Sequence, residues 1–183
     1  MAAPDATDAA KLARKPAREL GLRIVGVEEI TKTRPTSSSG GGDPGLVQPS
    51  AMNDEAEFFK QFVKPERRRR YLSLLDTRKG RRKLTEALNH FKDLDPRYAR
   101  LLPPNAQTVN QIEALLKRKG APEGCHVTSS NAHIDNREMP LSEALEQTVG
   151  YGSGTILSCI PGKLAYFEGE EQNERYILEH TCE

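Results

Sequence analysis

Cysteine and histidine side chains offer the first candidate chemistry in this sequence. Cys159 lies in the segment GTILSCIPGKLAYFEGEE, close in sequence to Lys163, and the pair Cys125-His126 precedes it. A thiolate activated by an imidazole is a nucleophile, and such Cys–His partnerships form in space rather than along the chain. A small enzyme that uses His126 and a cysteine is therefore one hypothesis, although the sequence singles out no catalytic residue.

The residues around Cys159 favour a buried thiol instead. Residues 155–160 and 163–168 carry apolar side chains on both faces, which is typical of strands covered on both sides. Pro161-Gly162 indicates a type II turn, which fits tight hairpins poorly, so we expect a longer loop or a bulge. A buried thiol stays protonated and is a poor nucleophile. The predicted faces are Leu157, Cys159, Leu164 and Tyr166 on one side, and Ile156, Ser158, Ile160, Ala165 and Phe167 on the other.

Residue types that bind metals and phosphates also occur, without the spacing that such sites need. Zinc sites usually show two closely spaced ligand pairs, and no second pair accompanies Cys125-His126. A phosphate loop runs from strand through glycines to helix, whereas Gly150–Thr155 follows a predicted helix and precedes a strand. The sequence therefore predicts neither a metal site nor a cofactor. The remaining potential ligands, in a polar connection, are His133, Asp135 and Glu138.

A dense set of basic residues is the strongest anomaly in the sequence. Two clusters lie near predicted helix N-termini, where each exposed cation is disfavoured by roughly 0.3–1 kcal/mol. Some compensating interaction is therefore expected. The basic residues are Arg67, Arg68, Arg69, Arg70, Arg78, Lys79, Arg81, Arg82 and Lys83.

Two explanations of these charges remain open. If the helices that carry them form an antiparallel hairpin, Arg67–Arg70 would lie near Asp93 and Asp95, and acidic residues near the C-terminus (Glu168, Glu170, Glu171, Glu174) would neutralise the rest. The alternative is an external partner, either RNA or DNA phosphates or an acidic protein. Tyr71 and Tyr98 are the few aromatic residues nearby, so recognition would be of backbone rather than of sequence.

The elements that position these residues follow from apolar periodicity and from turn signals. Helices are predicted over 55–63, 65–76, 81–91, 108–118 and 141–149, and strands over 125–129, 155–160, 163–168 and 175–180. Residues 93–104 are predicted to form an irregular connection that is interrupted by prolines. The fold class is thus α+β, a helical N-terminal layer packed on a small mixed sheet in the order α-α-α-α-β-α-β-β-β. The strands 125–129 and 155–160 are predicted to lie parallel through a helical crossover.

Composition divides the chain into a tail and one domain. Residues 1–51 are rich in Pro, Ala, Gly and Ser and are predicted to be a flexible tail, in which only Gly21–Ile30 suggests a strand. Residues 52–183 are predicted to form a single domain, and Met52 could be the true start. Residues 60–100 hold 14 basic and 5 acidic residues, whereas residues 121–183 hold 3 basic and 11 acidic residues. The domain therefore has a basic helical part (52–120) and an acidic sheet part (121–183).

Composition also limits the location of the protein. Three cysteines without a C-x-x-C motif fit a reducing compartment, and no apolar run approaches the ~18 residues of a membrane span. No hydrophobic signal segment opens the chain, so we predict a cytoplasmic protein that makes no membrane contact. The function predicted is a small non-enzymatic interaction or regulatory module whose basic helical surface binds nucleic-acid backbone or an acidic partner. The sequence does not predict the oligomeric state.

Overall fold

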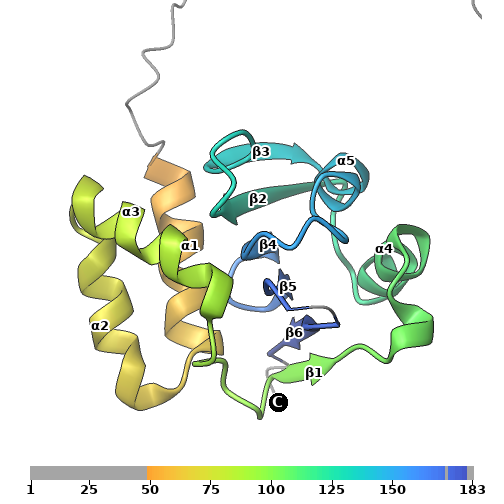
Figure 1. Ribbon diagram of the computed structural model, residues 1–183, viewed down its shortest axis with the longest axis horizontal. Helices are drawn as coiled ribbons and strands as arrows, with labels where there is room; N and C mark the ends of the chain where they lie inside the picture. Colours follow the sequence, from red (N-terminus) through yellow and green to blue (C-terminus); the bar gives the residue numbers. More distant parts are fainter. Residues whose placement is uncertain (1–48, 172, 181–183) are drawn as a thin grey trace, which may run out of the picture. The chain divides into compact units, whose positions relative to one another are not determined.

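The computed structural model describes residues 49–171 and 173–180, and these form helices on both faces of one sheet (Figure 1). The predicted α+β class is confirmed. The predicted strand within 21–30, and all but the last three residues of the predicted tail, lie outside the described residues. No helix in the described part of the chain is long and apolar enough to cross a bilayer.

Three helices form the layer on one face of the sheet: α1 (Pro49–Phe62), α2 (Pro65–Leu75) and α3 (Arg78–Ala87), followed by a 3₁₀ turn, η1 (Leu88–His90). Phe58, Phe59 and Phe62 recur at helical spacing on α1 and are fully buried. Pro65 begins α2, where its missing N–H costs nothing. The predicted third helix ended at Phe91, but the regular helix ends at Ala87, and η1 completes the apolar stripe with Leu88.

The sheet contains six strands in the order β1-β6-β5-β4-β2-β3, and every neighbouring pair is antiparallel. Two short strands at its edges, β1 and β3, were not predicted. The strands are β1 (Ala99–Leu101), β2 (Gly124–Ser129), β3 (Arg137–Pro140), β4 (Thr155–Ile160), β5 (Leu164–Glu168) and β6 (Arg175–Glu179).

The predicted parallel pairing of residues 125–129 with 155–160 is wrong. β2 and β4 are antiparallel, with His126 opposite Ser158. The cause is β3, which pairs antiparallel with β2 and reverses the chain before the helix that follows. The helical crossover therefore joins β3 to β4, and β2 lies between them.

Two further helices, α4 (Val109–Arg118) and α5 (Leu141–Glu146), lie on the opposite side of the sheet from α1–α3 (Figure 1). A capping box at Thr108 and Gln111 begins α4, and a short 3₁₀ turn, η2 (Pro104–Ala106), precedes it. The two faces of the sheet thus support two separate apolar clusters, one with α4 and α5 and one with α1–α3.

The segment around Cys159 is the middle of this sheet, as predicted. Leu157, Cys159, Leu164 and Tyr166 pack on the α4–α5 side, whereas Ile156, Ala165 and Phe167 pack on the α1–α3 side. The expected irregularity is present, because the β4–β5 register shifts between Ser158 and Ile160. Ile160 consequently packs with the α4–α5 cluster rather than on its predicted face.

Candidate functional site

The nine basic residues predicted as a site are carried by α2 and α3, two helices joined by Asp76 and Thr77 (Figure 1). Thr77 begins α3 by accepting a hydrogen bond from the Gly80 N–H at 3.0 Å. Gly80 is buried, and a Cβ at this position would collide with the Leu74 carbonyl oxygen of α2. The two helices therefore pack in close contact at the start of α3.

Two of the predicted internal pairs are present. Arg67 lies 3.8 Å from a carboxylate oxygen of Asp93, and Arg68 lies 3.9 Å from one of Asp95. Both contacts are too long for hydrogen bonds. Arg68 is held more firmly by the backbone, since its Nε donates to the Val63 carbonyl at 2.8 Å.

The acidic residues near the C-terminus do not neutralise the basic clusters. Glu171 and Glu174 pair with Lys92, and Glu170 lies 3.2 Å from His90. Glu168 is buried and pairs with Arg175. The predicted neutralisation by these four acids is therefore wrong. The acidic partners of α2 and α3 are instead Asp93, Asp95, Glu86, Glu55 and Asp135.

Five of the nine residues are exposed and unpaired. Within residues 49–171 and 173–180, their side chains make no hydrogen bond or ion pair. Arg82 lies on the same face of α3 as Arg78 and Lys79. It pairs with Glu86 at 2.9 Å, and both of these side chains are well exposed. We call the five unpaired residues the basic surface: Arg69 and Arg70 on α2, and Arg78, Lys79 and Lys83 on α3.

Arg81 differs from its neighbours, because only 15% of its side chain is exposed. Its Nη2 donates to Glu55 Oε1 at 2.6 Å, and its Nη1 donates to Asp135 Oδ2 at 2.7 Å. Burial alone would lower the pKa of Arg81, but the two carboxylates raise it overall, so the guanidinium is charged. Arg81 holds α3 against α1 and the β2–β3 connection, and both carboxylates engage its guanidinium.

Glu55 is the central acid of this buried network, and its side chain is fully buried. Besides Arg81, it accepts a hydrogen bond from Thr128 Oγ1 at 3.1 Å and lies 3.7 Å from His126 Nε2. Burial alone would raise the pKa of Glu55, but His126 and Arg81 lower it overall. Sequence reasoning missed Glu55, although its position predicted burial: it lies on the stripe of Phe58, Phe59 and Phe62.

His126, on β2, lies between two carboxylates. Its Nδ1 is 3.0 Å from Glu138 Oε1 on β3, and its buried Nε2 makes no hydrogen bond. Burial alone would lower the pKa of His126, but Glu55 and Glu138 raise it overall. The two carboxylates therefore favour the protonated form of the imidazole, which joins the network.

Neither described cysteine can use His126 as a partner. Cys125 and Cys159 are free, buried and packed on the α4–α5 side of the sheet, whereas His126 faces Glu55 of α1. Burial raises the pKa of Cys159 to about 12 and raises that of Cys125 as well. This geometry provides no activated thiolate.

In the described part of the chain, neither the potential metal ligands nor the glycine-rich segment 150–155 forms a reactive site. Across residues 49–171 and 173–180, no three His, Cys, Asp or Glu side chains are arranged to hold a metal ion. In the glycine-rich segment, Gly150 has a φ of 86° and donates to Glu168, and Gly154 is buried against the backbone of Leu88 and Asn89. These glycines connect α5 to β4, as expected.

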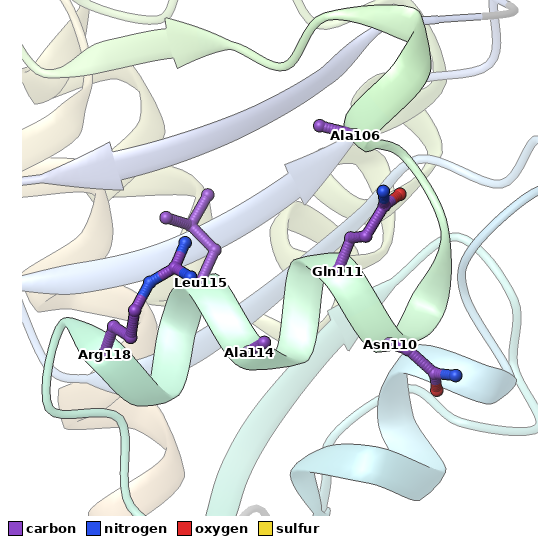
Figure 2. Close-up of a pocket in the computed structure, with 6 residues that line it drawn as sticks. All are labelled: Ala106, Asn110, Gln111, Ala114, Leu115 and Arg118. Atoms are coloured by element: carbon purple, nitrogen blue, oxygen red, sulfur yellow. The ribbon is translucent and has the colours of Figure 1, made fainter.

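A shallow hollow lies on the outer side of α4 and η2 (Figure 2). Gln111, which points toward η2 in the figure, is already engaged: it donates to the Asn105 carbonyl at 3.0 Å and accepts from Thr108. Arg118 is the one charged residue in the lining, so the hollow offers no pair of groups for catalysis. The lining residues are Ala106, Asn110, Gln111, Ala114, Leu115 and Arg118.

Comparison with known proteins adds no functional information. No family model matches this chain, and neither the curated proteins nor the solved structures contain a match to it.

Proposed function

We propose that this protein is a non-enzymatic, cytoplasmic module that binds nucleic acid through the phosphate backbone, with the basic surface of α2 and α3. One observation carries the proposal: five exposed cationic side chains lie on two consecutive helices, and none of them has an acidic partner in the described part of the chain. Backbone phosphates are the anions best suited to such a surface, because each contact releases condensed counterions.

The local structure supports an external role for these side chains. Lys79 and Lys83 are one helical turn apart on α3, and Arg82 lies on the same face. Several like charges near a helix N-terminus repel each other and oppose the helix dipole, so a bound anion would relieve both effects. The buried pairs of Arg81 hold α3 in place without using the exposed residues.

The enzyme hypothesis has less support. A Cys–His pair needs the two side chains on one side of the sheet, but Cys125 and Cys159 lie on the side opposite His126. The raised pKa values of both thiols also oppose nucleophilic chemistry.

Salt-dependent binding to labelled DNA and RNA tests the proposal. If the five residues each contact one phosphate, the logarithm of affinity falls with the logarithm of salt with a slope of about −4 to −5. The triple variant Arg78→Gln/Lys79→Gln/Lys83→Gln should bind more weakly, with a slope shallower by about 3. Failure of the protein to bind either nucleic acid at about 50 mM salt would overturn the proposal.

A matched control separates the basic surface from net charge. Arg118, Arg137 and Lys163 are exposed on other elements, and their replacement by Gln removes the same charge. This control variant should retain most of the affinity and the full salt slope. Equal losses in the two variants would show that binding depends on net charge and not on α2 and α3. An acidic polypeptide such as polyglutamate should compete poorly, whereas strong competition would favour an acidic protein partner.

A further inference from the structure

The basic surface has no aromatic side chain on which a base could stack. Tyr71, the aromatic residue of α2, is 7% exposed and stacks on Phe59 with 5.4 Å between ring centroids. Tyr98 packs edge-on against Phe62 and lies 4.8 Å from the His180 ring. Among the described residues, the large exposed hydrophobic side chains are Leu101 and Tyr151, and neither belongs to α2 or α3.

Single-stranded nucleic acid depends on such stacking for much of its affinity. Each stacked base contributes about 1–3 kcal/mol in proteins that bind single strands. A duplex presents no unstacked bases, and its phosphates lie at fixed positions on the outside. A cationic surface without aromatic platforms therefore suits a duplex better than a single strand.

The form of α3 favours DNA over RNA. α3 is a ten-residue helix, which corresponds to about 15 Å; its first two turns carry long exposed cations, and the exposed Glu86 follows them. The major groove of B-form DNA admits an α-helix, whereas the major groove of A-form RNA is deep and too narrow. Arg69 and Arg70 on the preceding helix would then contact the flanking backbone, the arrangement in which one helix faces the groove and its neighbour crosses the strand.

Two buried contacts hold α3 in a fixed orientation, as a helix that faces a DNA groove requires. The close approach at Gly80 holds it against α2, and the ion pairs of Arg81 fix it to Glu55 and Asp135. A helix presented in a fixed orientation loses little conformational freedom when it binds.

We infer, on the basis of the proposed function, that the ligand is double-stranded B-form DNA, bound with α3 facing the major groove and with α2 on the adjacent phosphates. The contacts are cationic and go mainly to the backbone, so the binding is largely independent of base sequence.

The inference is tested with four labelled probes of one mixed sequence: a DNA duplex, an RNA duplex and the two single DNA strands. Fluorescence anisotropy of the full chain at one salt concentration should show the DNA duplex bound at least about tenfold more tightly than the other three probes. The surface provides no base stacking for single strands, and the major groove of the RNA duplex is too narrow for α3. Single strands bound as tightly as the DNA duplex, or an RNA duplex bound equally well, would overturn this inference and leave the proposed function standing. If no probe binds, the proposed function itself fails.

Groove competition gives an independent readout. Methyl green, which occupies the major groove, should displace the protein from the DNA duplex, whereas netropsin, which occupies the minor groove, should not. The reverse result would overturn the placement of α3 even if the duplex preference held. The control variant Arg118→Gln/Arg137→Gln/Lys163→Gln should behave as the unmodified protein in both assays.

Discussion

Arg81 and Arg82 are adjacent in the sequence, yet their side chains have opposite surroundings. Arg81 is buried between two carboxylates, whereas the side chain of Arg82 is 82% exposed and pairs with Glu86 on its own helix. Removal of one partner from a buried ion pair leaves an uncompensated charge, but an exposed pair contributes little. The same residue type is therefore structural at one position and part of a solvent-exposed pair at the next.

We predict that Arg81→Gln lowers the free energy of unfolding by about 3–5 kcal/mol, because the buried Glu55 would lose the cation to which it is hydrogen-bonded and Asp135 would lose its ion-pair partner. Arg82→Gln is the matched control and should cost less than about 1 kcal/mol. Urea denaturation of the two variants measures the difference. Similar costs for both would contradict a structural role for the Arg81 pairs.

His126 predicts a pH dependence of stability. Its pKa in the folded protein is raised above the ordinary value of about 6.5, so its stabilising contribution is complete below that pH and is lost as the pH rises through the folded-state pKa. Glu55 acts in the opposite direction, since its pKa is lowered and its contribution is lost only in acid. The charged groups around the imidazole are Asp54 and Glu55 on α1, Glu138 on β3 and, through Glu55, Arg81 on α3.

Urea denaturation from about pH 5.5 to about pH 9 should therefore show a loss of stability on the alkaline side. The variant His126→Gln should be less stable at low pH but should lose this alkaline decline. The control His133→Gln changes an exposed histidine in the β2–β3 connection and should keep the full profile. An unchanged profile in His126→Gln would rule out His126 as its origin.

Single residues show why the buried network could not be predicted from the sequence. Arg81 and Asp135 were both noted, one as a basic-cluster residue and one as a potential metal ligand, but they are 54 positions apart and meet only when the sheet forms. The periodicity of α1 did contain a usable signal, because an acid on an apolar stripe must be paired when buried. That signal was sufficient to predict burial of Glu55, which the sequence analysis missed, but not the identity of its partners.

At the level of elements, apolar periodicity predicted the helices and the central strands to within about four residues, except that α1 begins at Pro49 and not at residue 55. The two strands that were missed lie at the sheet edges, where pairing on one side allows short and polar segments: β1 is Ala99–Leu101, and β3 includes Pro140. The missed β3 also produced the wrong β2–β4 direction, because a strand inserted before a crossover reverses the orientation of the next one.

Contacts between elements impose a strict requirement at Gly154. A Cβ at this position would overlap the backbone of Leu88 and Asn89 in η1, and the Gly154 N–H donates to Asn89 Oδ1 at 2.8 Å. We predict that Gly154→Ala costs at least about 2 kcal/mol, because the displaced atoms are backbone and cannot rotate away.

Gly124→Ala is the control for this substitution. Gly124 lies at the exposed start of β2, where an added Cβ would come no closer than 3.8 Å to Met139. Its replacement should change stability by less than about 0.5 kcal/mol. Thermal or urea unfolding of the two alanine variants compares them directly, and equal effects would show that the η1 contact does not constrain the fold.

At the level of the whole domain, the basic and acidic parts meet at several separate contacts. The buried network crosses the interface between α1–α3 and the sheet, Lys92 pairs with Glu171 and Glu174, and Lys119 pairs with Glu179. None of these ion pairs involves a residue of the basic surface. The near-neutral total of +1 therefore conceals a local excess of positive charge on α2 and α3.

This arrangement predicts that folding does not depend on the basic surface. The variant Arg78→Gln/Lys79→Gln/Lys83→Gln removes like charges near the start of α3, so its free energy of unfolding should equal that of the unmodified protein or exceed it by up to about 1 kcal/mol. Added salt should stabilise the unmodified protein more than the variant, because screening weakens a repulsion that the variant lacks. Urea denaturation at low and at high salt measures both effects. A loss of more than about 1 kcal/mol in the variant would mean that these side chains have internal partners, and the surface would then not be free to bind DNA.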